Sequence, residues 1–187
     1  MNRQLGAFGR RLSILALACS VIGGAQATSG TPVRDEREVR AAYVFNLVKY
    51  VDWPSNRGEI LIGFVGETEF GAVMEKMLSG RSSDSYTIRV LVMPTEEELA
   101  RCKVVYFAAE SQEGKRKILN QVKDMNVLTI GESEAFVRGG GVIALVKAGD
   151  RIQIQVNPDA AQRARVQISS RVLNLATIVH STQGTGN

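Results

Sequence analysis

The sequence predicts an α/β fold, a three-layer sandwich in which helices cover both faces of a largely parallel central sheet. Short apolar runs alternate with helix-like stretches between residues 35 and 130, as in chains built from βαβ units. These runs are apolar throughout, which is typical of parallel strands buried on both faces. Two strand-like runs joined by a turn signal follow after residue 141, and they predict a C-terminal β-hairpin ahead of a closing helix.

The first predicted element is a helix over residues 35–50. Acidic residues near its start, Asp35, Glu36 and Glu38, complement the positive end of the helix dipole. Pro54 closes the element, because the residue before a proline avoids helical geometry. Apolar side chains recur at spacings of three and four and therefore share one helix face: Ala41, Val44, Leu47, Val48 and Val51.

Strands and helices then alternate along the middle of the chain. Thr95 and Glu98 form a capping box, in which each side chain satisfies a free backbone amide of the other residue. In chain order, the patterns predict a strand over 60–65, a helix over 70–78, and strands over 87–93 and 104–108. A helix over 111–124 and a strand over 127–130 follow.

The last third of the chain departs from this alternation. Runs at 142–146 and 151–156 are separated by the turn signal at 147–150, and the second run alternates apolar and polar residues. Asn157 followed by Pro158 predicts the start of a helix. A closing amphipathic helix is then indicated by Val172, Leu175, Ala176 and Val179. We therefore expect a single domain over residues 28–180 and a disordered polar tail over residues 181–187.

The N-terminus has the pattern of a secretory signal peptide over residues 1–27. Three arginines and no acid precede the apolar run 12–22, and the small residues Ala25 and Ala27 suit cleavage near Ala27. The apolar run is shorter than the roughly 20 residues of a membrane-spanning helix. An N-terminal membrane anchor stays open as an alternative. A lipoprotein attached through Cys19 is disfavoured, because Ala16 stands where leucine is preferred and apolar residues continue beyond the cysteine.

Removal of the signal peptide leaves 160 residues and an almost neutral chain. Three of the 23 basic residues and none of the 19 acidic ones lie in the removed segment, so the net charge falls from +4 to +1. Nucleic-acid binders usually carry a concentrated basic stripe. The longest basic cluster, residues 115–117, lies among acids and amides and is typical of a solvated helix face. We expect no nucleic-acid partner.

Few residues remain that could carry catalytic chemistry. The mature chain keeps one cysteine, Cys102, and one histidine, His180, which lies next to the polar tail. Cys102 precedes a strand, so burial is favoured over a reactive thiol or an intermolecular disulfide. The glycines at 139–141 precede a strand and not a helix, which favours a tight turn over a phosphate-binding loop. We expect no enzyme activity, no cofactor and no metal site.

Several segments occur in an order that is similar to a known family. They are residues 40–54, 62–66, 102–107, 127–131, 136–143, 154–157, 160–161 and 168–176. In this order they resemble the YfiR family of periplasmic proteins, whose first helix ends in an aromatic–proline pair. The resemblance implies a periplasmic, non-catalytic homodimer that binds and represses an inner-membrane diguanylate cyclase. It also implies an outer-membrane lipoprotein that relieves the repression, and thereby couples envelope signals to cyclic-di-GMP and biofilm formation.

One departure from the family concerns Cys102. The resemblance implies that this cysteine often pairs with another in the first strand, where this chain has Gly63. Cys102 is therefore expected to be a free thiol.

Two other functions stay open at this stage. A periplasmic small-ligand module would bind its ligand at the carboxyl ends of parallel strands, near the loops 66–68 and 131–133. A hydrolase or redox enzyme would need Cys102 or His180. For a regulator, we expect partner binding through the first helix and through the region of the closing helix, by Arg40, Tyr43, Asn46, Lys49 and Arg171. The alternative is that these five residues only orient the helices.

Overall fold

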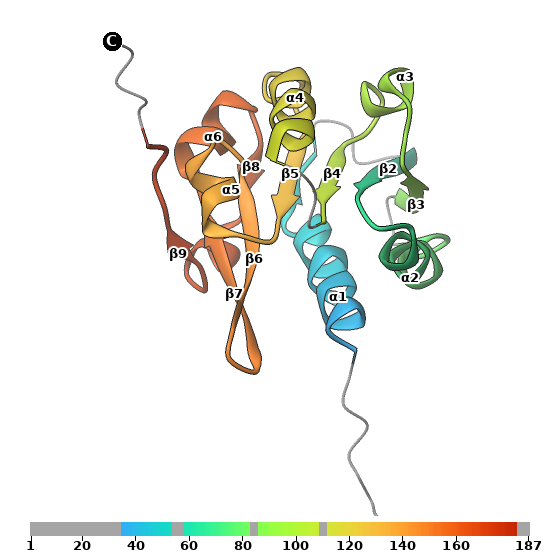
Figure 1. The fold of residues 1–187 in the computed structure, drawn as a ribbon, viewed down its shortest axis with the longest axis horizontal. Helices are drawn as coiled ribbons and strands as arrows, with labels where there is room; N and C mark the ends of the chain where they lie inside the picture. Colours follow the sequence, from blue (N-terminus) through green and yellow to red (C-terminus); the bar gives the residue numbers. More distant parts are fainter. Residues whose placement is uncertain (1–34, 54–57, 83–85, 109–111, 183–187) are drawn as a thin grey trace, which may run out of the picture. The chain divides into compact units, whose positions relative to one another are not determined.

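The computed structural model describes residues 35–53, 58–82, 86–108 and 112–182. Its centre is a seven-stranded sheet, and Figure 1 shows helices on either side of the strands. The strand order is β3-β2-β4-β5-β6-β7-β9. All neighbouring strands in it are parallel except the β6–β7 hairpin. The strands are β2 (Gly58–Val65), β3 (Tyr86–Val92), β4 (Val104–Phe107), β5 (Leu128–Gly131), β6 (Ile143–Ala148), β7 (Arg151–Val156) and β9 (Thr177–Ile178).

Helices cover both faces of this sheet. One face packs against α1 (Glu36–Lys49), α2 (Thr68–Leu78), α6 (Pro158–Arg163) and α7 (Ser170–Leu173). The other face packs against α3 (Glu96–Leu99), α4 (Gln112–Val122) and α5 (Glu134–Arg138). Alternate residues of each buried strand point into the two apolar layers, so that Ile62 faces the first layer and Leu61 the second. The prediction of a three-layer α/β sandwich is thereby confirmed.

Local sequence signals explain where the helices begin. The Asp35 side chain accepts a hydrogen bond from the Arg37 amide at 3.0 Å, which caps α1. The capping box of Thr95 and Glu98 is present, with bonds of 2.8 and 3.3 Å. Asn157 caps α6 ahead of Pro158, as the sequence predicts. The expected hairpin between β6 and β7 turns at Gly149, whose φ of +61° suits a residue without a side chain.

The C-terminal region differs from its prediction. The closing helix α7 ends at Leu173, so Leu175, Ala176 and Val179 do not form one helical face with Val172. The chain instead becomes extended in β9, which pairs in parallel with β7. The β-branched residues from Thr177 onward suit a strand, and the Val179 amide donates to the Val156 carbonyl at 2.8 Å. Leu175 consequently stays largely exposed.

Several smaller elements were not predicted. They are α5 and a short antiparallel pair formed by β1 (Val51–Asp52) and β8 (Gln167–Ile168). Ser181 and Thr182, the first residues of the expected tail, make hydrogen bonds to Asn157 and to the Arg138 carbonyl. The predicted signal peptide, Pro54 and residues 183–187 lie outside the described residues.

Candidate functional site

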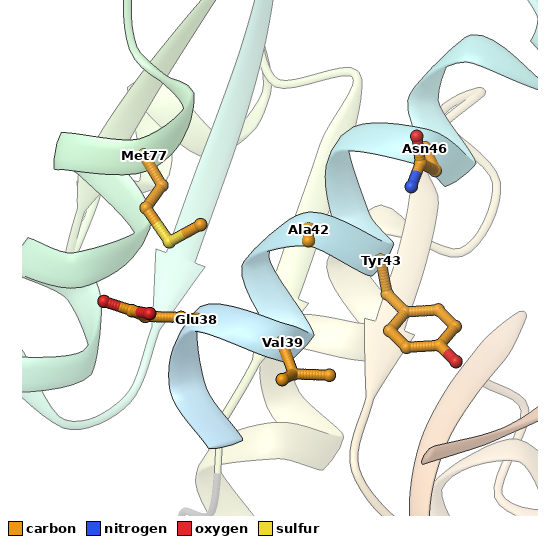
Figure 2. Close-up of a pocket in the computed structure, with 6 residues that line it drawn as sticks. All are labelled: Glu38, Val39, Ala42, Tyr43, Asn46 and Met77. Carbon is orange, nitrogen blue, oxygen red and sulfur yellow. The ribbon is translucent and has the colours of Figure 1, made fainter. Parts of the chain in front are cut away.

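The outer surface of α1 carries a cavity of about 440 Å³ that we call the α1 groove (Figure 2). The inner face of the helix packs on the sheet through Ala41, Val44 and Leu47, which are almost fully buried. The helix period therefore turns another set of side chains outward. The α1 groove is lined by Glu38, Val39, Ala42, Tyr43 and Asn46 of α1 and by Met77 of α2.

Two larger side chains form the walls of this groove around a small residue. Figure 2 shows Met77 on one side of α1 and Tyr43 on the other, with Ala42 between them. The Tyr43 hydroxyl donates a hydrogen bond of 3.4 Å to the Ile152 carbonyl of β7, which holds the ring against the neighbouring strand. The structure thus places two of the predicted partner-binding residues, Tyr43 and Asn46, in one groove.

A pair of cations lies at the carboxyl-terminal end of α1. The Lys49 ammonium lies 4.0 Å from the centre of the Phe45 ring, and the Arg81 guanidinium lies 4.9 Å from it. Both side chains gain from the negative face of the ring. Within the described residues, neither cation has a carboxylate oxygen within 4.0 Å. Lys49 belongs to the predicted set, whereas Arg81 was missed.

Arg171 lies near the same end of the helix. The Ser169 amide at the start of α7 donates to the Tyr50 carbonyl just after α1, at 2.9 Å. The β1–β8 pair joins these two regions as well. Arg171 itself is exposed on α7. The two predicted regions, the first helix and the closing helix, are therefore neighbours in the fold.

Arg40 points the opposite way, into the interior. It is 8% exposed and pairs with Glu36 one turn earlier and with Glu132, 3.5 Å away. The Tyr106 hydroxyl donates to the same Glu132 carboxylate at 2.7 Å. This geometry fits the alternative interpretation of Arg40, in which the side chain orients the helix and does not meet a partner.

Two residues near Arg40, Glu36 and Tyr106, have shifted pKa values. Hydrogen bonds from Lys147, at 2.5 Å, and then from Arg40 lower the pKa of the Glu36 carboxyl. Burial, followed by the nearby Glu132 charge, raises the pKa of the Tyr106 phenol well above its ordinary value. Tyr106 therefore stays protonated and acts as a hydrogen-bond donor to Glu132.

A second cavity, of about 240 Å³, lies on the inner side of the start of α1, and we call it the switch-point pocket. The chain leaves β2 for β3 on one side and then returns to β4 on the other side of β2. Such reversals of strand order are where open α/β sheets bind ligands. The pocket is lined by four acids, two arginines and two apolar residues: Asp35, Glu36, Arg37, Arg40, Glu67, Phe70, Ala108 and Glu132.

The sequence predicts a hypothetical small-ligand site near the loops 66–68 and 131–133. The structure brings Glu67 and Glu132 of these loops into the switch-point pocket. It does not bring the reactive residues Cys102 and His180 to the pocket lining. The strand-to-helix positions after β2 and β5 were the signal that located this pocket.

Cys102 is a buried free thiol. It is 2% exposed, and its Sγ donates to the Glu98 carbonyl at 3.3 Å. Burial raises the pKa of the thiol to about 11, so that only a minute fraction is thiolate at neutral pH. A β-carbon built on Gly63 would lie 3.1 Å from the Sγ atom, so the strand position of Gly63 faces the cysteine as the family resemblance implies.

The remaining candidate groups do not assemble into a reactive centre in the described structure. His180 pairs with Asp159 at 2.9 Å on the surface. Among the described ranges, no group of three or more His, Cys, Asp or Glu side chains could hold a metal ion. None of the helices in that same portion of the chain is long and apolar enough to span a membrane.

Comparison with solved structures finds distant relatives of the fold. A conserved domain protein from Vibrio cholerae O1 biovar El Tor is 11% identical with a TM-score of 0.52. An ABC domain in complex with L-Trp from Streptococcus pneumonia is 12% identical with a TM-score of 0.48. In both cases the match covers 76% of this chain and only 60% of the other. The Vibrio likeness supports the fold alone, and the second is too weak to support an argument.

Sequence comparison gives a more specific result. No characterised protein matches significantly. A family model described as YfiR/HmsC-like matches residues 37–177. The match includes all of α1 but Glu36, every strand of the central sheet up to the first residue of β9, and the lining of both cavities except Asp35 and Glu36. The match extends over about three quarters of the sequence and contains all of the segments that resemble the family. The chain therefore belongs to the YfiR/HmsC-like family.

Proposed function

We propose that the chain is a periplasmic regulatory protein that binds an inner-membrane diguanylate cyclase and holds it inactive. The observation that carries the proposal is the family match over residues 37–177, because this family suggests a periplasmic regulator of cyclic-di-GMP signalling. Export directed by the segment 1–27 would deliver the protein to the periplasm, into which the periplasmic portion of the cyclase extends. Envelope signals would then reach cyclic-di-GMP and biofilm formation through this contact.

The geometry of the domain is suited to binding another protein. Its described surface offers a groove along α1 with an aromatic wall and, beyond the groove, a cation at the end of the helix. Aromatic and arginine residues dominate binding energies at protein interfaces. The Cys102 thiol is buried with a raised pKa, which does not suit a nucleophile. A binding role therefore uses the features that the domain presents, whereas a catalytic role does not.

Repression follows from differential affinity. A regulator shifts the cyclase only as far as it prefers the inactive conformation over the active one. A tenfold preference corresponds to about 1.4 kcal/mol, which a few well-packed side chains provide. An outer-membrane lipoprotein that binds the regulator would relieve repression by competing for it. Homodimer formation would place two such surfaces in one particle.

The experiment is coexpression of the full-length chain, with its leader, and the membrane diguanylate cyclase encoded nearest to it. We expect the chain to be processed near Ala27, to copurify with the cyclase from solubilised membranes, and to lower cellular cyclic-di-GMP. A leaderless version retained in the cytosol is the matched control and should do neither. An exported chain that neither copurifies with the cyclase nor changes cyclic-di-GMP would contradict the proposal.

A second candidate function, a periplasmic small-ligand module, is favoured by the switch-point pocket. Its position at the carboxyl ends of β2, β4 and β5 is where ligands bind in open α/β sheets. Thermal-shift measurements against periplasmic metabolites would test it, with Glu67→Gln as the variant. Stabilisation of the wild-type domain that the variant loses would support a ligand, and no stabilisation by any metabolite would weigh against it.

A further inference from the structure

We propose that the α1 groove, together with Lys49 and Arg81, is the docking surface for one amphipathic helix of the periplasmic portion of the cyclase. The inference rests on the proposed function and adds the surface and the chemistry of the partner segment. Its basis is a groove with a small residue at its floor and an acid, Glu38, in its lining, followed along α1 by the cations Lys49 and Arg81.

The shape of the groove suits a helix. Ala42 is exposed and has the smallest side chain in the lining, while Met77 and Tyr43 rise on either side of it (Figure 2). Amphipathic helices bind proteins by placing apolar side chains at spacings of three, four and seven residues into such grooves. Methionine adapts to different partner side chains because its thioether is flexible and polarisable. The floor and walls together could accept large apolar side chains of the partner.

The charges at the two ends define the polarity of the partner. Glu38 lies in the first turn of α1 and lines the groove. Lys49 lies eleven residues later, which corresponds to about 16 Å along the helix. Glu38 is exposed and, within the described residues, has no basic nitrogen within 4.0 Å. A complementary helix therefore carries a basic side chain at one end and an acidic side chain about three turns away.

The two cations at the carboxyl-terminal end of α1 favour an anionic group on the partner. Lys49 and Arg81 come from different parts of the chain and are held near the same Phe45 ring. Because opposite charges attract, a carboxylate that approaches this end of the helix is stabilised by each of the two cations. An arginine also fits a carboxylate with two parallel hydrogen bonds. Aspartate or glutamate on the partner helix is the expected counterpart.

The mixed charges favour a protein helix over other anionic partners. A lipid surface or a nucleic acid would be attracted by Lys49 and Arg81 and repelled by Glu38 at the other end of the same groove. The predicted net charge of the mature chain, +1, supplies little long-range attraction to either. Electrostatic complementarity of this kind also fixes the direction in which a partner helix lies.

The test is titration of full-length cyclase, in detergent, with variants of the mature chain. Ala42→Trp fills the groove, and Lys49→Glu and Arg81→Glu reverse the basic end. Lys123→Glu is the matched control, because Lys123 is also exposed but follows α4 on the other face of the sheet. We expect each groove variant to weaken binding at least tenfold and the control to bind like the wild type. Circular dichroism and melting temperature confirm that each variant is folded.

The outcomes separate this inference from the proposed function. If the wild type binds the cyclase and Ala42→Trp and both charge reversals bind it equally well, the docking surface is overturned while the regulator proposal stands. Failure of the wild type to bind the cyclase would overturn both. A charge swap tests the contact directly. If an acidic residue of the partner helix pairs with Lys49, changing that acidic residue to lysine should restore the affinity that Lys49→Glu loses. The wild type could also bind anionic phospholipid vesicles. If Lys49→Glu abolishes this vesicle binding and leaves cyclase binding intact, the basic pair binds a membrane and not the cyclase.

Discussion

Replacing Gly63 by cysteine should create a disulfide with Cys102. A β-carbon on Gly63 would lie 3.1 Å from the Cys102 sulfur, and in a disulfide the β-carbon of one cysteine lies about 3 Å from the sulfur of the other. Gly63 lies in β2, and Cys102 lies just before its parallel neighbour β4. The Cys102 sulfur therefore already lies at the distance from position 63 that a bridge requires.

The magnitude follows from the length of the closed loop. The bridge would close about 40 residues, from 63 to 102. The chain-entropy model then gives about 4 kcal/mol of stabilisation relative to the reduced form. For a domain of this size, each kcal/mol moves the melting temperature by about 2–4 °C. We expect the oxidised form to melt roughly 10 °C above the reduced form.

The reduced form should be less stable than the wild type. The new β-carbon would also lie 3.2 Å from Pro94 Cγ and 3.5 Å from Leu99 Cδ2. Extra atoms in a packed interior typically cost about 1–3 kcal/mol. Gly63→Ser has the same shape and cannot form a bridge, so it measures this steric cost separately.

The assay is thermal unfolding with and without reductant, beside thiol counting under denaturing conditions. Because burial raises the pKa of Cys102 to about 11, the folded thiol reacts slowly, and the variant should be refolded in oxidised glutathione. The reasoning is refuted if both thiols stay reactive after such refolding, or if the bridged and reduced forms melt at the same temperature.

Three further outcomes are expected. Tyr106→Phe removes the 2.7 Å hydrogen bond to the Glu132 carboxylate and should cost about 1–3 kcal/mol in urea unfolding; an unchanged midpoint would show that the bond contributes nothing. The free energy of unfolding should fall as the pH drops below about 4.5. The pKa of Glu36 is lower in the folded state than in the unfolded state, so this carboxylate stabilises the fold above its unfolded pKa and loses that effect as the pH falls through its folded pKa. Lys147→Met should reduce this acid sensitivity, and an identical pH profile would contradict it. Gly141→Ala should destabilise the fold by about 1–3 kcal/mol, since its β-carbon would lie 2.1 Å from a Phe136 ring carbon, and wild-type stability of that variant would show that the ring can move aside.

Elements whose signals lie within a few residues could be predicted from the sequence. The capping box at Thr95, the proline after Asn157 and the fully apolar strands each act over one or two turns of chain, and the structure has all of them. The end of the chain could not be predicted in the same way. Thr177 and Ile178 are a strand because β7 has a free edge beside them, and no local pattern records that edge.

The two faces of α1 show the same division for the candidate site. Arg40 precedes the buried Val44 by four residues and Leu47 by seven, so the helix period alone places it on the inner face, where the structure has it. Its charge made it look like a surface residue. Two carboxylates offset the burial of this charge: Glu36, one turn earlier on the same helix, and Glu132, 92 positions later in the sequence, to which Tyr106 also donates. Burial of one charge without partners is costly, and the contact with Glu132 is the part of this pairing that only the folded sheet supplies.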